Sequence, residues 1–513
     1  MATDASRQRL PPQVPYIIGN EGAERFSFYG MRNILTPFLV TSLLLHLPEG
    51  DRAGAAKDVF HTFVIGVYLF PLLGGWLADR FWGKYNTILW FSLLYCVGQG
   101  MLAVFDTHRT GFYSGLALIA FASGGIKPLV ASFVGDQFDK STKHLAKIVF
   151  DAFYWIINFG SFFASLLMPV FLRDYGASVA FGIPGLLMAV ATLVFWLGRK
   201  HYVMVPPEAP SRDSVLRVCR TALFAPGPHR NGLALATVGL MAAVLVLAFT
   251  PQLGIVITFC LALVILIGFG GGGAWLQLER AVGPHPAEAV EGVRAVLRLL
   301  VIFALVTPFW LLFDQKASTW VLQAGDMTRP DWFHPAQMQA LNPALVMLLI
   351  PFNNLVLYPL LRRRGYEMTG LRRMTTGMAS AGLAWVAAGA FQLVIDAGDP
   401  ISIAWQILPY ALLTFGEVLV SASGLEFVYS QAPRAMKGTI MSLWYLAVTT
   451  GNLWVLLANV TVRNDTVLGA VAATGLSTDG FLMFFFAGFA FVTAVVFGIY
   501  ARHYREVDNY RSA

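Results

Sequence analysis

The chain has 513 residues, of which 57% are hydrophobic and 13% are charged, and its formal net charge is +7. A soluble protein of this length exposes far more charge, so the composition predicts a polytopic membrane protein. The three cysteines form no CxxC pair, the histidines lack ligand spacing and the basic residues gather at helix ends, which argues against a disulfide framework, a metal centre and a nucleic-acid partner.

Fourteen apolar segments, each about as long as a membrane-spanning helix, follow one another along the chain. The first six lie near residues 15–44, 57–80, 86–106, 111–135, 148–171 and 178–198. A basic stretch with several prolines, residues 199–230, precedes two further segments near 232–249 and 253–270. Residues 268–286 are glycine-rich and then amphipathic, which predicts a linker. The last six segments lie near residues 293–323, 337–361, 373–395, 402–430, 438–460 and 479–502.

This order predicts an all-α membrane protein made of six helices, an insert of two, and six more helices. We expect three parts: an N-terminal six-helix bundle at 1–200, a linker with two extra transmembrane helices at 201–289, and a C-terminal six-helix bundle at 290–513. Transporters often have such a plan, with the substrate site near the midplane between the two halves. Because each chain then holds a complete cavity, we expect a monomer.

The loops predict the orientation. Basic residues gather on one side, for example Arg80, Lys84, Arg199 and Lys200, whereas an opposite loop, residues 396–400, reads DAGDP. Lysine and arginine are enriched in cytoplasmic loops. We therefore expect a multi-pass protein of the plasma membrane, the inner membrane of a bacterium, with both termini in the cytoplasm.

The first predicted helix carries charge where lipid would be expected, in the stretch EGAERFSFYG at residues 21–30. A helix advances about 100° per residue, so Tyr29 lies on one stripe with four charged residues: Glu21, Glu24, Arg25 and Arg32. An ionised residue at the membrane centre costs ~2.5–3.5 kcal/mol. The stripe is therefore expected to pair its charges and face a wet cavity; the alternative is an internal ion pair that only fixes helix packing.

Three more charges lie within predicted helices of both halves, Lys127, Asp314 and Glu417. They belong to the fourth, seventh and tenth of the twelve core helices, and intramembrane charges usually face the interior. We therefore expect one shared polar cavity. Pro128 cannot donate a hydrogen bond to the carbonyl of Gly124, which permits a bend beside Lys127 or, alternatively, a static kink.

Several motifs resemble those of the proton-coupled oligopeptide transporter family. The stretch EGAERFSFYG resembles the signature ExxERFxYYG, and FYWIINFGS at 153–161 resembles FYWxINxGS. GGWLADRFWGK at 74–84 is similar to the loop motif of the wider major facilitator superfamily. QMQALNP, PFNNLVLYP and SGLEFVYSQAP, which begin at residues 337, 351 and 423, also resemble family sequence. One departure is Phe28, where the family usually has tyrosine.

This resemblance covers nearly the whole chain. It implies the major facilitator fold, with 12 core transmembrane helices in two six-helix bundles and, as in bacterial members, two extra helices between the halves. It also implies a proton-coupled symporter that imports di- and tripeptides by alternating access, and not an enzyme. No cofactor is expected besides the coupled protons.

A promiscuous peptide site must hold what all short peptides share, which is the ammonium, the carboxylate and the backbone. Glu417 is the predicted partner of the ammonium, where Asn158 and Asn342 add hydrogen bonds. Arg25 and Lys127 are the predicted partners of the carboxylate.

Apolar walls for the peptide side chains are predicted from aromatic residues, namely Tyr29, Tyr68, Tyr154, Trp310 and Trp444. For each of them the alternative is ordinary helix packing or a place at the membrane interface. Ser423, in the last family motif, is also predicted to bind the peptide.

The proton is predicted to travel on Glu21 or Glu24, because the pKa of a carboxyl rises on burial and falls beside a cation such as Arg25 or Lys127. Protonation of one carboxyl would loosen the pairing and free a cation for the peptide.

The outer gate is predicted to be an ion pair between Arg32 and Asp314. A histidine titrates near neutral pH, and HTFV at 61–64 resembles the stretch that bears the essential histidine of animal peptide transporters. We therefore hypothesise that protonated His61 competes with Arg32 for Asp314; a structural histidine is the alternative. Lys316, two residues from Asp314, is expected on a different face and receives no role.

The nearest alternative function is transport of nitrate or another small anionic or zwitterionic solute by a member of the same family. Glu417 favours peptides, because nitrate has no ammonium to bind. A channel is disfavoured by the dispersed single charges. An integral-membrane enzyme is disfavoured because the sequence shows no metal cluster, nucleophile elbow or phosphate loop.

Overall fold

The computed structural model describes residues 11–138, 143–207, 213–224, 231–253, 255–431 and 437–504. These residues are helical nearly throughout, and their only β pairing consists of two isolated bridges. The predicted all-α class is therefore confirmed. The two chain ends, for which a cytoplasmic location was predicted, lie outside the described residues.

The helices of the N-terminal half are α1 (Val14–Phe38), α2 (Glu49–Leu69), α3 (Pro71–Leu77), α4 (Gly83–Val104), α5 (Arg109–Asp136), α6 (Lys143–Tyr175) and α7 (Ala177–Leu197). The middle of the chain forms α8 (Val215–Phe224), α9 (Asn231–Leu247), α10 (Thr250–Leu253), α11 (Ile255–Ile265) and α12 (Gly272–Gln277). The rest forms α13 (Ala287–Asp314), α14 (Thr319–Gly325), α15 (Leu341–Phe352), α16 (Tyr358–Arg363), α17 (Gly370–Asp396), α18 (Ile407–Glu417), α19 (Ser423–Gln431), α20 (Lys437–Thr461), α21 (Asp465–Ala472) and α22 (Thr478–His503).

Short π and 3₁₀ turns join several of these helices. The π turns are η2 (Leu39–Leu43), η3 (Ala78–Trp82), η5 (Leu266–Gly271), η9 (Asn353–Leu357) and η11 (Val418–Ala422). The 3₁₀ turns are η4 (Gly198–Lys200), η6 (Leu278–Ala281), η7 (Gln315–Ala317), η8 (Pro335–Ala340) and η10 (Ile403–Gln406). Breaks of this kind in transmembrane helices are tolerated where neighbouring protein satisfies the backbone.

Within the described part of the chain, 11 helical stretches are long and apolar enough to cross a membrane. One of them, Glu49–Val104, contains both predicted segments near 57–80 and 86–106. The α1 helix carries four charged residues and so differs from a purely apolar span, and α9 is apolar but shorter. This pattern is that of a polytopic membrane protein, while the count of fourteen stays a prediction.

The chain forms two compact units. Unit 1 contains residues 1–208, 314–367 and 390–415, and unit 2 contains residues 209–313, 368–389 and 416–513. Unit 1 thus joins the first six-helix segment to parts of later helices, such as α14 and α15. The three parts predicted from the sequence stay a prediction.

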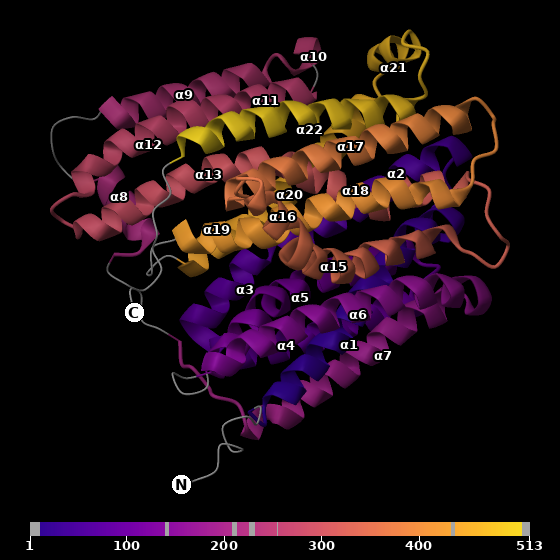
Figure 1. Ribbon diagram of the computed structural model, residues 1–513, viewed down its shortest axis with the longest axis horizontal. Coiled ribbons are helices and arrows are strands. Elements are labelled where there is room, and N and C mark those ends of the chain that lie inside the picture. The colour runs from indigo at the N-terminus through magenta and orange to yellow at the C-terminus, as the bar shows by residue number, and fades with distance from the viewer. Residues whose placement is uncertain are drawn as a thin grey trace. The chain divides into compact units, whose positions relative to one another are not determined.

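The centre of unit 1 is α1, which packs along α6 and α7, while α4 packs along α5 and α7 (Figure 1). Phe38 of α1 meets Phe112 of α5 and Phe181 of α7, with ring centroids 5.0 Å apart in each pair. Aromatic pairs at this spacing stabilise helix packing. Because neighbouring helices surround α1, its charged stripe is buried within unit 1.

The α3 and α5 helices approach each other closely through Gly74 and Gly124. A Cβ atom on Gly74 would overlap the carbonyl oxygen of Gly124. This is the carbonyl that Pro128, four residues later, leaves without its helical partner. Small residues let transmembrane backbones come together in this way. The contact fixes α5, and with it Lys127, against the helices of unit 1.

We expect Gly74→Ala to destabilise the protein, because overpacking a close contact costs about 1–3 kcal/mol. Gly75→Ala is the matched control, since a Cβ atom there meets nothing within 4 Å. The measurement is the midpoint temperature of thermal unfolding in detergent. This temperature should fall for Gly74→Ala and stay the same or rise for Gly75→Ala. Equal midpoints for the two variants would contradict the close contact.

In unit 2, the structure corrects one prediction made from the sequence. Residues 268–286, predicted as a linker, are mostly helical, since they begin within η5 and continue through α12 and η6. Gly273 of α12 lies against Gly232 of α9, where an added Cβ atom would overlap the opposing backbone. Gly273 and Gly232 therefore allow α12 and α9 to pack closely, as small residues do in membranes.

Candidate functional site

The charged stripe of α1 contains a buried group of two carboxylates and one guanidinium. Arg25 Nε donates a hydrogen bond of 2.6 Å to Glu21 Oε1, and it lies 2.8 Å from Glu24 Oε2. Glu21 is 1% exposed and Glu24 is fully buried. The helical spacing brings these three residues together as predicted, and one cation faces two carboxylates here.

Both carboxyl groups have unsatisfied oxygens. Glu21 Oε2 and both side-chain oxygens of Glu24 are buried and accept no hydrogen bond within the described part of the chain, although Glu24 Oε2 is in ion-pair contact with Arg25. A buried ionised oxygen without a partner is costly, whereas a protonated carboxyl carries no charge and can itself donate. This α1 group is therefore suited to holding one proton.

Lys127 of α5 lies beside this group and is held by aromatic rings. Its Nζ atom is 3.4 Å from the ring centroid of Phe28 and 4.9 Å from that of Tyr68. A desolvated cation over an aromatic face gains ~2 kcal/mol or more. The sequence did not assign Phe28 this contact; the available signal was that Phe28 follows Glu24 by four residues and so shares its face of α1.

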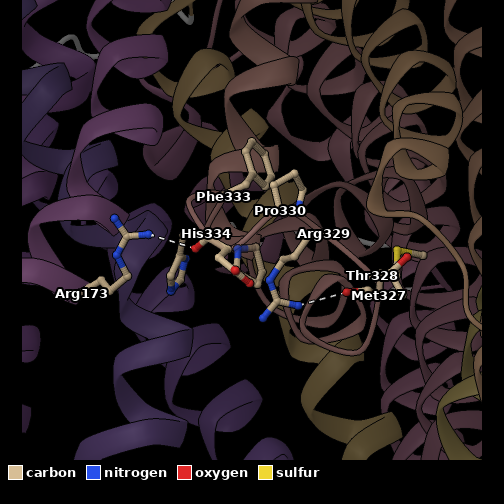
Figure 2. A pocket seen from close by; sticks show the side chains of 9 residues that line it. Arg173, Met327, Thr328, Arg329, Pro330, Phe333 and His334 are labelled. Carbon is tan, nitrogen blue, oxygen red and sulfur yellow. Dashed lines mark hydrogen bonds between the residues drawn. The ribbon is translucent and has the colours of Figure 1, made fainter.

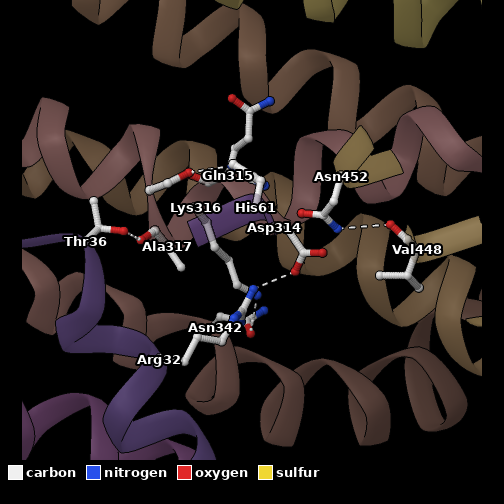
Figure 3. Close-up of polar contacts among 11 residues, drawn as sticks. Arg32, Thr36, His61, Asp314, Gln315, Lys316, Ala317, Asn342, Val448 and Asn452 are labelled. Carbon is white, nitrogen blue, oxygen red and sulfur yellow. Dashed lines mark hydrogen bonds and ion pairs between the residues drawn. The ribbon is translucent and has the colours of Figure 1, made fainter. Parts of the chain in front are cut away.

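The predicted contact between Arg32 and Asp314 is present in unit 1 (Figure 3). Arg32 Nη2 and Asp314 Oδ1 are 2.6 Å apart, and both side chains are almost fully buried. Thr36 Oγ1 donates a hydrogen bond of 2.9 Å to the carbonyl of Ala317. An ion pair and a hydrogen bond therefore tie α1 to the end of α13 and to η7.

His61 of α2 belongs to the same region. Its Nε2 atom lies 3.0 Å from Ser318 Oγ, and the side chain is fully buried. The predicted competition with Arg32 for Asp314 stays a prediction.

Lys316, which the sequence left without a role, donates a hydrogen bond of 2.7 Å from Nζ to Asn342 Oδ1 (Figure 3). Asn342 Nδ2 in turn donates to Thr414 Oγ1 at 3.1 Å. Lys316 is 5% exposed. The contact spans 26 residues of sequence, and no local spacing predicts it.

Three other residues of unit 1 that were predicted to bind the peptide either lie in more open positions or form a hydrogen bond within their own helix. Asn158 Nδ2 donates to the carbonyl of Tyr154 at 3.0 Å, one turn earlier in α6. The Tyr154 side chain is exposed and Tyr29 is half-buried. Tyr29 packs edge-on against Phe28 with centroids 5.4 Å apart. Whether these three contact a substrate stays a prediction.

The remaining predicted residues lie in unit 2. The rings of Trp310 and Trp444 meet nearly at right angles with centroids 6.2 Å apart. Ser423 is buried, and Gly424 after it packs directly against the Trp444 ring. Glu417 is half-buried and ends α18 just before the π turn η11; π turns are frequent at functional sites. The last two residues of the SGLEFVYSQAP motif lie outside the described residues.

Unit 1 also contains a polar cavity of about 440 Å³ next to the loop between α14 and η8 (Figure 2). Arg173 and Arg329 line it, with His334 between them. Burial, together with the charges of Arg329 and Arg173, lowers the pKa of His334 to about 4. His334 is therefore neutral near pH 7, which agrees with its Nδ1 atom accepting a hydrogen bond from the amide of Ala336.

The described residues contain no group of three or more histidine, cysteine, aspartate or glutamate side chains that could hold a metal ion.

The chain matches the PTR2 model of the POT family over residues 85–231 and 276–473. It is 32% identical over 407 residues to human solute carrier family 15 member 2, and the match covers 76% of this chain and 50% of the human protein. It is also 32% identical over 406 residues to peptide transporter 3 of Caenorhabditis elegans, with 75% and 51% covered. The chain spans about half the length of these animal relatives.

Two solved structures resemble this chain over nearly its whole length. An auto-inhibited POT family peptide transporter is 65% identical with a TM-score of 0.90, and the match covers 98% of this chain and 99% of that one. The POT family transporter PepTSo is 64% identical with a TM-score of 0.90, over 96% and 98% of the two chains. The fold of this chain is therefore that of these transporters.

Proposed function

This chain belongs to the POT family, whose members are transporters rather than enzymes, and on that premise we propose that it imports di- and tripeptides together with protons by alternating access. Its similarity to peptide transporters supports the substrate class. The observation that carries the proposal is the buried α1 group, in which Arg25 alone faces Glu21 and Glu24. A cluster of this kind in a membrane protein is expected to bind protons and charged substrates.

We assign the coupled proton to Glu21 or Glu24. Their unsatisfied oxygens favour one protonated carboxyl, and protonation would weaken the hold on Arg25. A membrane potential of ~100 mV supplies ~2.3 kcal/mol per charge moved inward, which supports a roughly 50-fold accumulation of substrate.

We assign the peptide termini to three charged residues. Glu417 takes the ammonium, while Arg25 and Lys127 take the carboxylate. Asn342 adds a hydrogen bond to the ammonium only if Lys316 leaves its amide oxygen, because that oxygen now accepts from Lys316.

The aromatic residues and the remaining polar groups complete the proposed peptide site, namely Tyr29, Tyr68, Tyr154, Asn158, Trp310, Ser423 and Trp444. The rings offer apolar faces without fixed hydrogen-bonding demands, which suits peptides of varied sequence. Trp310 Nε1 is a buried donor without a partner in the described residues, so a peptide carbonyl could satisfy it.

The cellular setting is part of the proposal. We place the chain in the plasma membrane as a multi-pass monomer with both termini in the cytoplasm.

The test is uptake of labelled dialanine into proteoliposomes under an inward proton gradient, with and without a protonophore. Accumulation that the protonophore abolishes supports proton-coupled peptide transport. A parallel assay with labelled nitrate checks the alternative substrate. Folded protein that accumulates nitrate and not dialanine would overturn the proposal.

We expect His61→Gln to flatten the rise of dialanine uptake as the outer pH falls from about 7.5 to 5.5, because histidine ordinarily titrates in this range. His334→Gln is the control, since the pKa of His334 is about 4 and it stays neutral across the range. The measurement is the initial rate at each pH, normalised for each variant. A His61→Gln profile that matches the wild type would assign His61 a structural role only.

A further inference from the structure

Lys127 is a nearly buried cation that is held by rings rather than by a carboxylate. Within the residues that the structure describes, its Nζ atom forms no ion pair or hydrogen bond, and its near contacts are the rings of Phe28 and Tyr68. The Phe28 ring, 2% exposed, is itself fixed edge-on against Tyr29 and stacked on Phe63. The ring under the ammonium is therefore a rigid support.

The charged residues around Lys127 include cations that repel its ammonium and carboxylates that attract it. Five charged residues interact with it electrostatically: Arg25, Glu24, Arg32, Asp314 and Glu21. Two of these are cations that repel the ammonium, and both cations are already paired, Arg25 with Glu21 and Arg32 with Asp314. Glu24 is thus well placed to capture Lys127, since neither of its oxygens accepts a hydrogen bond within the described chain and its ion-pair contact with Arg25 involves Oε2.

A captured Lys127 would be a poorer partner for a peptide. An ion pair in a low-dielectric site is strong, so a substrate carboxylate would first have to break the bond between Lys127 and Glu24. A cation on an aromatic face keeps its charge and is released more easily, because the ring is neutral. The position of Lys127 on Phe28 thus leaves the ammonium ready for an anion.

We propose that Phe28 is a positioning residue for Lys127: its ring keeps the ammonium away from Glu24 and so sets the affinity of the chain for the peptide carboxylate. This inference rests on the proposed function, and it extends that function to a position where the family signature usually has tyrosine. Phe28 suits this task because its 2% exposed ring brings no hydroxyl that would need a partner.

The test is the affinity for dialanine of purified full-length protein, measured by isothermal titration calorimetry between pH 5 and 8. We expect Phe28→Leu to weaken binding about tenfold at pH 7.5, because Lys127 then pairs with Glu24. Phe28→Tyr keeps the ring and should bind within about twofold of the wild type.

A second substitution separates positioning from space-filling. Glu24→Gln in the Phe28→Leu background should restore most of the lost affinity at pH 7.5, since the competitor is gone. A loss of affinity in Phe28→Leu that Glu24→Gln does not restore would overturn the proposal. Fluorinated phenylalanines at position 28 keep the shape and weaken the ring's hold on a cation, so affinity at pH 7.5 should fall with each added fluorine even if Phe28→Leu does not fold.

Measurements on the wild type distinguish a failure of the proposed function from a failure of the role proposed for Phe28. A folded wild-type protein that binds no dialanine at any pH would refute the proposed function. A wild type that binds dialanine, with Phe28 variants that all match it, would refute the role of Phe28 alone.

Discussion

Glu21→Gln is expected to abolish proton-driven accumulation of dialanine. Glu21 is 1% exposed and accepts the 2.6 Å hydrogen bond from Arg25, so glutamine can keep the contact but cannot exchange a proton. Accumulation should fall from the roughly 50-fold that one charge supports at ~100 mV to about onefold. Exchange of labelled for unlabelled dialanine without a gradient should persist, because Lys127 and Glu417, the charges proposed to bind the peptide, remain.

The measurement is the ratio of internal to external dialanine in proteoliposomes, with the exchange assay run on the same preparation. Glu24→Gln is tested in parallel, since either carboxyl can hold the proton. Glu49→Gln serves as the control, because Glu49 is exposed in the first turn of α2. If both Glu21→Gln and Glu24→Gln still accumulate dialanine, the proton is carried elsewhere.

The sequence predicted the parts of the site that depend on helical period. Glu21, Glu24 and Arg25 are three or four residues apart, and this spacing alone puts them on one face of α1. The hydrophobic segments predicted the all-helical membrane fold in the same way. Arg32 and Asp314, on the first and seventh core helices, were predicted to form an ion pair because alternating access needs a gate, and their contact is present.

Contacts that depend on which helices meet were not predictable from spacing. Lys127 on Phe28 joins residues 99 positions apart by their numbering, and a lysine beside carboxylates would be expected to pair with one of them. The glycines near residue 270 were predicted to belong to a linker, but glycine is common both in linkers and at close helix contacts. Only the presence of Gly232 in the facing helix decides between the two.

Asp314→Asn is expected to open the contacts that join α1 to η7. Arg32 and Asp314 are 4% and 2% exposed, and removing one partner of a buried ion pair costs ~3–5 kcal/mol because a charge is left unpaired. The closed arrangement, in which these contacts are intact, should therefore lose roughly 10²–10⁴-fold in population relative to arrangements in which Arg32 meets water. Arg32→Gln together with Asp314→Asn should recover much of this loss, because no charge is then left buried.

Labelling of a cysteine at position 317 measures this opening, because Ala317 is fully buried and accepts the hydrogen bond from Thr36 in the closed arrangement. The native cysteines are first replaced by serine, and the probe is a membrane-impermeant maleimide.

Asp174→Asn is the matched control, because Asp174 also pairs with an arginine, Arg173. Both side chains of that pair are about 40% exposed, and exposed pairs contribute ~0–1 kcal/mol. Labelling should therefore rise for Asp314→Asn and stay at the wild-type rate for Asp174→Asn. If the two variants label equally slowly, the closed arrangement is held by its neutral hydrogen bonds, and the buried ion pair does not act as a gate.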